Sequence, residues 1–424
     1  MITFDPPELR DDFIKTIRVF RDFAKITFDD CPGWHNDDFN YDGDPDDETI
    51  VTCDSVFGFD VGTSENIELP VPELIKLAKE FPLSKAIDRL YYVAPTRAYV
   101  RIEPENEGAY QFVNHINTHG AKNSRRFEYI SGDVIFALVN GFTPFALHMF
   151  KDGEYDDDIY PTYHDSDLFI EVRYPPGTTM DAWRTLVPAF LFELDEQTGL
   201  AFAQTPRPAY AGIWPGEYDK ETYLNKLDSI RLRPLMSGPG VESIFRLYER
   251  AIRHEADPEQ HFVGFVKVME YVSATVVNTE RNALLRRRLL SPRALSPDAG
   301  FIRELSQLFE SLRNYKKDSE ALRLTIETCC DVVELARYAP PRHRALSMID
   351  EASTPQERKK AFDALSATLS ATRNMFSHAK ANYTLTGEEC PEAELEQLTR
   401  CARVAARQCA RWFAHSDISL RIVD

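Results

Sequence analysis

Hydrophobic residues follow two different spacings along the 424-residue chain, and the change between them falls near residue 235. Upstream, short runs rich in Val, Ile, Phe and Tyr alternate with clusters of Gly, Pro and Asp, which is typical of strands joined by turns. We expect strands at 49–61, 89–103, 127–149, 168–174 and 190–194, and helices at 9–28 and 72–81. Residues 1–235 therefore predict a strand-rich α+β domain.

Beyond residue 240 the spacing becomes helical. Apolar residues from Phe262 to Val276 recur every three or four positions, which places them on one face of a long helix. A second face of this kind runs from Leu395 to Trp412. Between them, Thr354-Pro355-Gln356-Glu357 combines a capping box with proline at the first helical position, and it predicts a helix start. Residues 240–424 therefore predict an all-α bundle of five or six helices.

The charge changes at the same boundary. The segment Arg233–Gly240 concentrates Pro, Gly and Ser, which break regular structure. Residues 1–235 hold 42 Asp+Glu against 22 Lys+Arg, a net of −20, whereas residues 236–424 hold 26 against 27, a net of +1. The overall charge of −19 argues against a nucleic-acid binder, but the near-neutral second half removes that objection. We expect an acidic sensor or regulatory domain at 1–235 and a helical bundle at 240–424.

Composition narrows the class of protein. Hydrophobic residues make up 43% of the chain, which argues against disorder. The seven cysteines are scattered without CxxC spacing, and this favours a reducing compartment. The N-terminus lacks the basic start and apolar run of a signal peptide, and no apolar run approaches the ~18 residues of a membrane-spanning helix. We therefore expect a cytoplasmic protein without a membrane partner.

Two groups of residues in the first domain have metal-ligand character. Asp38, Asn40, Asp42 and Gly43 fit the first half of an EF-hand loop, but Thr49 replaces the bidentate Glu, so a solvated acidic loop is the favoured interpretation. A second group consists of His115, His119 and His164. Their spacing suits either a metal site or histidines of polar loops, because no HExxH pattern accompanies them.

The densest basic patch lies in the second domain and consists of Arg281 and Arg286–Arg288. A patch of this kind is a solvated helix face in many proteins. In a bundle of balanced charge it is also the best candidate for a strip that contacts phosphates. Both interpretations stay open.

The segment Arg373-Asn374-Met375-Phe376-Ser377-His378 gathers a guanidinium, an amide and an imidazole. If it is helical, Asn374 and His378 share one face, and the long side chain of Arg373 can reach them. A histidine moves protons near neutral pH, and an arginine holds and neutralises a phosphate, which together suit metal-free phosphodiester cleavage. The bare Arg–His spacing is common by chance, so the surrounding sequence has to supply the specificity.

Those surroundings resemble the HEPN superfamily, whose ribonuclease members carry Arg-x(4–6)-His, commonly with Asn after the Arg. Ala379-Lys380 is similar to the family's endings. A second stretch, from Leu247 through Asp257-Pro258-Glu259 to Phe262–Tyr271, is similar to the first helices of HEPN domains in bacterial defence and stress proteins. The resemblance covers about 240–424 and does not reach the first domain.

The resemblance implies a four- to five-helix bundle that dimerises and brings two copies of the motif into one cleft. It implies RNA cleavage by attack of the 2′-hydroxyl on the adjacent phosphate, without a metal or other cofactor. His378 would act as general acid and base, Arg373 would stabilise the charge on the phosphorane, and Asn374 would orient the imidazole or bind a phosphate oxygen.

Further residues take auxiliary roles under the same resemblance. Glu270 would assist the motif, although a plain ion pair with Lys267 one turn before it explains the residue as well. RNA would contact Lys380, together with the basic patch of Arg281, Arg286, Arg287 and Arg288.

The leading hypothesis is a metal-independent endoribonuclease of antiphage defence or of a toxin-like stress system. RNA is its substrate, a second copy of the chain and an activator or antitoxin are its partners, and the first domain senses, restrains or targets it. The alternative is a non-catalytic module for dimerisation or partner binding. A third hypothesis places metal chemistry in the first domain, through the three histidines named above.

Overall fold

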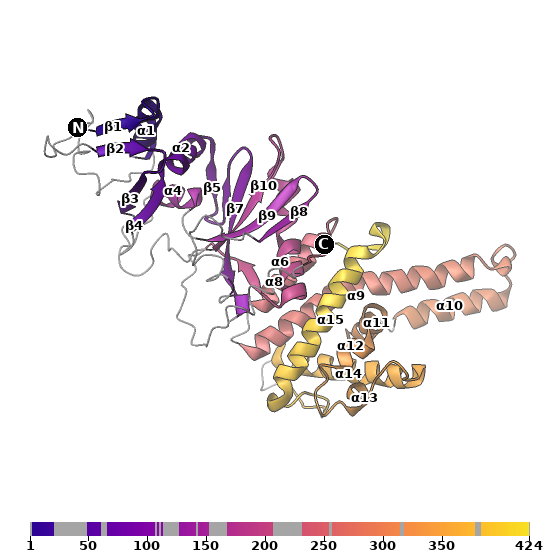
Figure 1. The fold of residues 1–424 in the computed structure, drawn as a ribbon. Coiled ribbons are helices and arrows are strands. Elements are labelled where there is room, and N and C mark those ends of the chain that lie inside the picture. The colour runs from indigo at the N-terminus through magenta and orange to yellow at the C-terminus, as the bar shows by residue number, and fades with distance from the viewer. Residues whose placement is uncertain are drawn as a thin grey trace. The chain divides into compact units, whose positions relative to one another are not determined.

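The computed structural model describes residues 2–20, 49–60, 66–106, 108, 109, 112, 127–140, 143–151, 168–206, 231–253, 257–313, 318–377 and 383–423. The chain forms two compact units (Figure 1). Unit 1 comprises Met1–Arg184 and Gln197–Leu232, and unit 2 comprises Thr185–Glu196 and Arg233–Asp424. All strands found in the described residues belong to unit 1, so the architecture is mixed α+β, as expected.

Unit 1 is built on a seven-stranded antiparallel sheet of order β5-β6-β7-β10-β9-β8, with β11 also pairing with β7. The strands are β5 (Lys85–Ile87), β6 (Tyr91–Val93), β7 (Arg97–Pro104), β8 (Glu128–Ser131), β9 (Val134–Asn140), β10 (Leu168–Arg173) and β11 (Phe202–Gln204). Most residues of the central strands β7 and β10 are buried, which explains why their apolar residues do not alternate with polar ones. Arg101 and Glu171 are buried with them.

The remainder of unit 1 packs around a second core. Its elements are β1 (Ile2–Asp5), α1 (Leu9–Val19), β2 (Thr49–Thr52), β3 (Val56–Asp60), β4 (Asn66–Pro70), α2 (Val71–Glu80), η2 (Phe81–Leu83) and α4 (Pro144–Lys151). Helix α5 (Met180–Arg184) packs on the main sheet instead, where Trp183 contacts Tyr91 and stacks on Tyr174. Strands β1 and β2 pair in parallel, and β3 and β4 form an antiparallel pair. The core between α1 and α2 is formed by fully or nearly fully buried side chains such as Phe13, Val71 and Leu74.

Two strand predictions in this region are wrong in part or in whole. The strand expected at 127–149 ends at Asn140, and Pro144 begins helix α4, consistent with the preference of proline for the first helical turn. Residues 190–194 are not a strand but the middle of α6 (Val187–Thr198). Nine residues of α6 are buried, and a helix buried on all sides has a continuous apolar run like that of a central strand.

Unit 2 is helical, and α9 (Pro258–Leu289) lies at its centre. Its other elements are α6, α8 (Val241–Ile252), η3 (Pro292–Ala294), α10 (Ala299–Arg313), α11 (Asp318–Cys329), α12 (Val332–Ala336), α13 (Arg344–Ser347), α14 (Pro355–Ser377), η5 (Glu392–Glu394), α15 (Leu395–His415) and η6 (Ile418–Leu420). Helices α8, α11, α14 and α15 all pack against α9. The helical faces predicted at 262–276 and 395–412 are confirmed.

Local signals explain where these helices begin and how closely they pack. The capping box is present, because the Thr354 amide donates to Glu357 Oε2 at 2.7 Å and the Glu357 amide donates to Thr354 Oγ1 at 3.3 Å. Helices α8 and α9 touch at Gly264, where an added Cβ would lie 2.8 Å from the Cα and Cβ of Ala251. Glycine is required at this crossing because there is no room for a side chain.

Buried ion pairs hold α6 in the bundle. Asp195 is fully buried and accepts from Arg403 at 2.5 Å, from Arg407 at 2.8 Å and from the Tyr248 hydroxyl at 2.5 Å. One turn further along α15, Arg411 pairs with both Glu193 and Glu196. Unit 2 therefore differs from the predicted range 240–424 by including Thr185–Glu196.

Among the helices of the described ranges, none has the length and apolar character needed to cross a bilayer.

Candidate functional site

Three of the residues predicted to carry chemistry, Arg373, Asn374 and Glu270, meet between α14 and α9. Arg373 lies in the last two turns of α14, and Glu270 lies near the middle of α9. Arg373 Nη2 lies 2.9 Å from Glu270 Oε1 and donates to Glu270 Oε2 at 3.1 Å. Arg373 Nη1 donates to Asn374 Oδ1 at 2.9 Å. The carboxylate of Glu270 therefore contacts the guanidinium of the motif, as the auxiliary role requires.

This cluster is half-buried rather than enclosed. The side chains of Arg373 and Glu270 are 25% and 30% exposed, so solvent and ligands reach them. Phe376, three residues after Arg373, packs edge-to-face on Phe262 of α9, with ring centroids 6.1 Å apart. The apolar residues of the motif therefore fix α14 to the bundle, and its polar residues stay accessible.

Tyr383 and Cys390, which follow the motif in the chain, are hydrogen-bonded back to α14. The Tyr383 hydroxyl donates to the Ala371 carbonyl at 3.1 Å, and the Cys390 amide donates to Thr372 Oγ1 at 2.8 Å. Glu389 accepts from the Tyr383 hydroxyl at 2.6 Å and from the Thr386 amide at 2.8 Å. Although burial raises the pKa of Glu389, these and neighbouring hydrogen bonds outweigh it and lower that pKa to about 2.

A groove of about 950 Å³ opens beside the end of α14. Its apolar lining comes from Met375, Phe376, Cys390 and Leu395. Four carboxylates also line it, those of Asp257, Glu259, Glu392 and Glu396. The carboxylates attract a basic peptide and repel the phosphates of a nucleic acid, and the apolar lining can bury an apolar side chain. The groove therefore suits a basic peptide better than a phosphate backbone.

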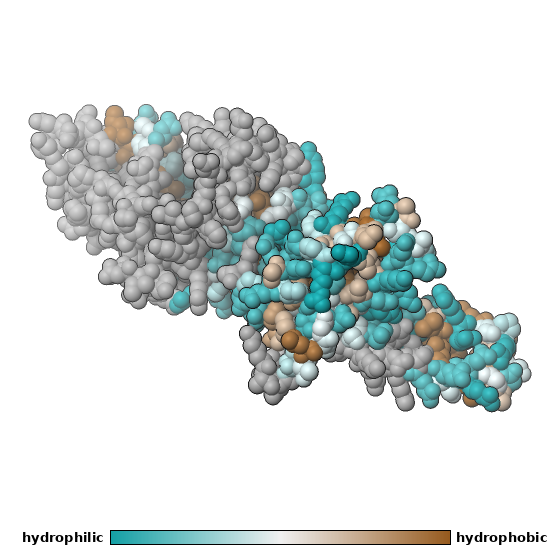
Figure 2. Space-filling view, turned by 90° about the horizontal axis from the view of Figure 1, so that it is seen from below, coloured by the Kyte–Doolittle hydropathy of each residue, from teal (hydrophilic) through white to brown (hydrophobic). Residues whose placement is uncertain are grey.

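The predicted basic patch is separate from the motif. Arg286–Arg288 are exposed at the C-terminal end of α9, and 16 helical residues, or about 24 Å, separate Arg286 from Glu270. Arg288 pairs with Glu304 of α10 at 3.1 Å, and Figure 1 shows α9 and α10 side by side there. Figure 2 shows brown residues among teal ones on this helical hairpin. The exposed apolar side chains of the hairpin lie close to the patch in sequence. They include Leu289, Leu290, Leu295, Ile302 and Phe309.

Several predicted site residues lie outside the described residues. These are His378 and Lys380 of the motif, His115, His119 and His164 of the histidine group, and Asp38, Asn40, Asp42 and Gly43 of the acidic loop. In the ranges that are described, no group of three or more His, Cys, Asp and Glu side chains could hold a metal ion.

Sequence reasoning missed the arginine stripe of α15. Arg403, Arg407 and Arg411 recur every four residues, and this spacing was the available signal that one helix face carries three cations. The spacing does not reveal the partners, because Asp195 lies 208 residues before Arg403. Two cysteines of the same helix, Cys401 and Cys409, are fully buried in the core.

Comparison with known proteins returned no match, whether to a family model, to a curated protein or to a solved structure.

Proposed function

We propose that unit 2 is a metal-independent endoribonuclease of the HEPN type. The observation that supports this proposal is the convergence of Arg373, Asn374 and Glu270 from two helices, one of which ends where the Arg-x4-His motif continues to His378. An accessible guanidinium beside an amide is suited to bind one phosphodiester group of RNA. Glu270 acts as a positioning residue, because its carboxylate fixes the direction in which Arg373 points.

The reaction follows from the chemistry of these groups. The RNA 2′-oxygen attacks the adjacent phosphorus while its proton passes to a general base, and the bond to the 5′-oxygen breaks as that oxygen takes up a proton. His378 serves as the proton donor and acceptor, because an imidazole titrates near neutral pH. Arg373 neutralises the charge that builds on the phosphorane oxygens. The products are a 2′,3′-cyclic phosphate and a 5′-hydroxyl end.

The proposal extends to the partners of the enzyme. Two copies of unit 2 associate and place two motifs in one RNA-binding cleft. The basic patch of Arg281, Arg286, Arg287 and Arg288, with Lys380, contacts the phosphate backbone. The acidic first part of the chain senses a trigger or restrains cleavage, as in an antiphage or toxin-like system of the cytoplasm, where an activator or antitoxin is a further partner.

Cleavage of total RNA by the purified full-length protein tests this proposal. We expect cyclic-phosphate ends that still form in EDTA, and a loss of about 100-fold or more in the rate on substituting Arg373→Ala or His378→Ala. Lys360→Ala removes an exposed cation from the same helix and should leave the rate unchanged. Equal rates in wild type and Arg373→Ala would refute the catalytic role of the motif.

The groove beside α14 favours a second candidate function, a non-catalytic module that binds a partner protein. Its carboxylates and apolar lining would hold a segment that carries Lys or Arg around an apolar anchor. Under this alternative, wild type and His378→Ala produce the same cellular phenotype, while the charge reversal Glu392→Lys abolishes it. A phenotype that depends on His378 and tolerates Glu392→Lys excludes this candidate.

A further inference from the structure

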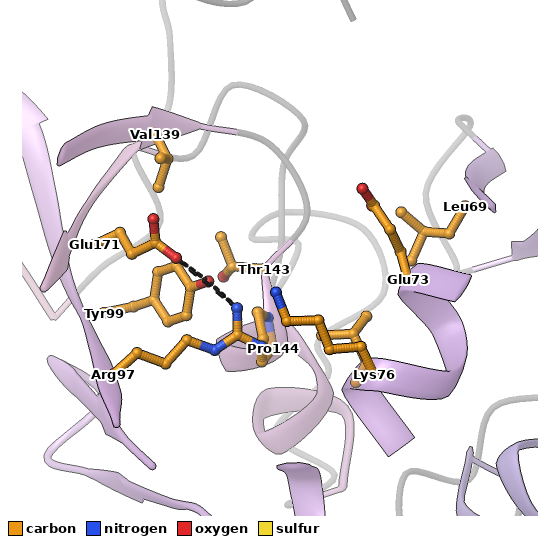
Figure 3. Close-up of a pocket in the computed structure, with 10 residues that line it drawn as sticks. Leu69, Glu73, Lys76, Arg97, Tyr99, Val139, Thr143, Pro144 and Glu171 are labelled. Carbon is orange, nitrogen blue, oxygen red and sulfur yellow. Dashed lines mark hydrogen bonds and ion pairs between the residues drawn. The ribbon is translucent and has the colours of Figure 1, made fainter. Parts of the chain in front are cut away.

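A cavity of about 190 Å³ lies in unit 1 between α2, the central sheet and the start of α4 (Figure 3). Its polar lining consists of Glu73 and Lys76 from α2, Arg97 and Tyr99 from β7, Glu171 from β10, and Thr143 before α4. A second cavity of about 360 Å³ shares Lys76, Arg97 and Glu171 with the first. Charged side chains from three separate parts of the fold thus converge on one cavity that opens to solvent.

The charge of Arg97 is already compensated in this wall. Its Nε donates to both oxygens of Glu80 at 2.6 Å, and its Nη1 lies 3.8 Å from Glu171 Oε1. The Tyr99 hydroxyl accepts from Arg97 Nη1 and donates to Glu171, both at 3.1 Å. The wall is therefore a rigid, hydrogen-bonded network that does not need a ligand to hold its shape.

Two buried hydrogen-bond donors of the cavity have no acceptor among the described residues. Thr143 is only 4% exposed, and its Oγ1 makes no hydrogen bond there. Arg97 Nη2 is likewise buried without a hydrogen-bond partner. Lys76 is exposed at the rim and its ammonium group points into the cavity, and Glu73 lines the same side (Figure 3). Buried donors without acceptors are costly, so a group rich in acceptors is the natural complement of this space.

We propose that this cavity binds the oxyanion group, a carboxylate or a phosphate, of a small molecule. Lys76 supplies the opposite charge, and Thr143 Oγ1 and Arg97 Nη2 supply hydrogen bonds. The volume limits the enclosed part of the ligand to about the size of benzene, because an engineered cavity of about 150 Å³ holds a benzene molecule. Leu69, Leu77, Val139 and Pro144 line the remainder and suit a short hydrocarbon portion. Glu73 and Glu171 limit the negative charge that the cavity accepts, so a single oxyanion group fits it better than a polyanion such as RNA. The site belongs to unit 1 and does not depend on the nuclease proposal.

Thermal unfolding and calorimetric titration of the full chain test the proposal, with sodium phosphate and sodium butyrate as probes and sodium chloride as the matched salt. Lys76→Met removes the cation, and Thr143→Val removes the buried hydroxyl at nearly constant shape. Lys79→Met is the control, because Lys79 lies on the same helix, one turn from Lys76, and pairs with Asp12 outside the cavity.

We expect at least one probe to raise the unfolding temperature of the wild type and of Lys79→Met. Lys76→Met and Thr143→Val should each bind that probe about tenfold more weakly or worse, which corresponds to a single lost charge-assisted hydrogen bond. Which probe binds decides between phosphate and carboxylate as the recognised group. Thr143→Val should itself fold at least as well as the wild type, because it removes an unsatisfied hydroxyl. Failure of both probes to stabilise the wild type, or equal stabilisation of all variants, would overturn the proposal.

Discussion

The ion pairs of Asp195 make the sharpest stability prediction, because they join α6 to a bundle whose other helices begin some 45 residues later in the chain. The substitution Asp195→Asn keeps the shape of the side chain and removes its charge. Arg403 and Arg407, whose side chains are 19% and 17% exposed, would then be left without the carboxylate that each contacts. Removing one partner of a buried ion pair costs about 3–5 kcal/mol, and we expect a loss of that size in the free energy of opening of α6.

Hydrogen exchange measured by mass spectrometry on peptides covering 187–198 and 395–415 reports this free energy locally, without requiring two-state unfolding of the whole chain. Glu396→Gln is the control, because it breaks an exposed ion pair with Arg400 on the same helix, where the side chains are 78% and 65% exposed. That control should cost less than about 0.5 kcal/mol. If Asp195→Asn costs less than about 1 kcal/mol, the buried network is not what holds α6 in unit 2.

The pH dependence gives an independent check of the same network. Burial raises the pKa of Asp195, but Arg403 and Arg407 outweigh burial and hold that pKa below its ordinary value. A carboxyl group whose folded pKa is depressed stabilises the fold above its unfolded pKa, and this contribution is lost as the pH falls through the folded pKa. The difference in protection of α6 between the wild type and Asp195→Asn should therefore be constant above about pH 4 and shrink below it. Taking the difference removes the pH dependence of the other carboxyl groups of α6, including Glu193, whose pKa burial raises.

Three further predictions concern unit 2. Gly264→Ala should destabilise the protein by about 1–3 kcal/mol in urea unfolding, because its Cβ meets Ala251, although Gly→Ala normally stabilises a helix; a gain in stability would contradict the close contact. Glu389→Gln should increase hydrogen exchange in 383–390. In the wild type, protection of that loop should fall as the pH drops from the ordinary carboxyl range toward about 2. Unchanged exchange in the variant would show that the charge of Glu389 does not stabilise the loop. A chain beginning at residue 240 lacks α6 and should melt lower than one beginning at residue 185, because Arg403, Arg407 and Arg411 lose their acidic partners; equal melting temperatures would show that unit 2 does not need α6.

The candidate site was predictable only in part. The sequence placed Arg373 and Asn374 on a helix, and α14 ends at Ser377, so the helical part of the motif was correctly anticipated. Glu270 was proposed as an auxiliary residue from the resemblance alone, and an ion pair with Lys267 was the alternative interpretation. The ion pair with Arg373 spans 103 positions of sequence, and no local pattern specifies such a pair.

Elements whose signals lie within a few residues were determined by the sequence itself. The apolar face of α9, the face of α15 and the capping box of α14 depend on residues three or four positions apart, so their spacing predicts them. The change of charge and of spacing near residue 235 likewise marked where the long segment of unit 2, Arg233–Asp424, begins.

Only the tertiary structure decided where α6 belongs and which groups surround the cavity of unit 1. The apolar run 187–194 is compatible with either a central strand or a buried helix, and only its packing against other elements determines that it is helical. Lys76, Arg97, Thr143 and Glu171 are far apart in sequence and meet only when α2, β7, α4 and β10 pack. Local preferences fix each element, but burial and charge pairing between distant elements fix the sites, because those energies exist only after the chain has folded.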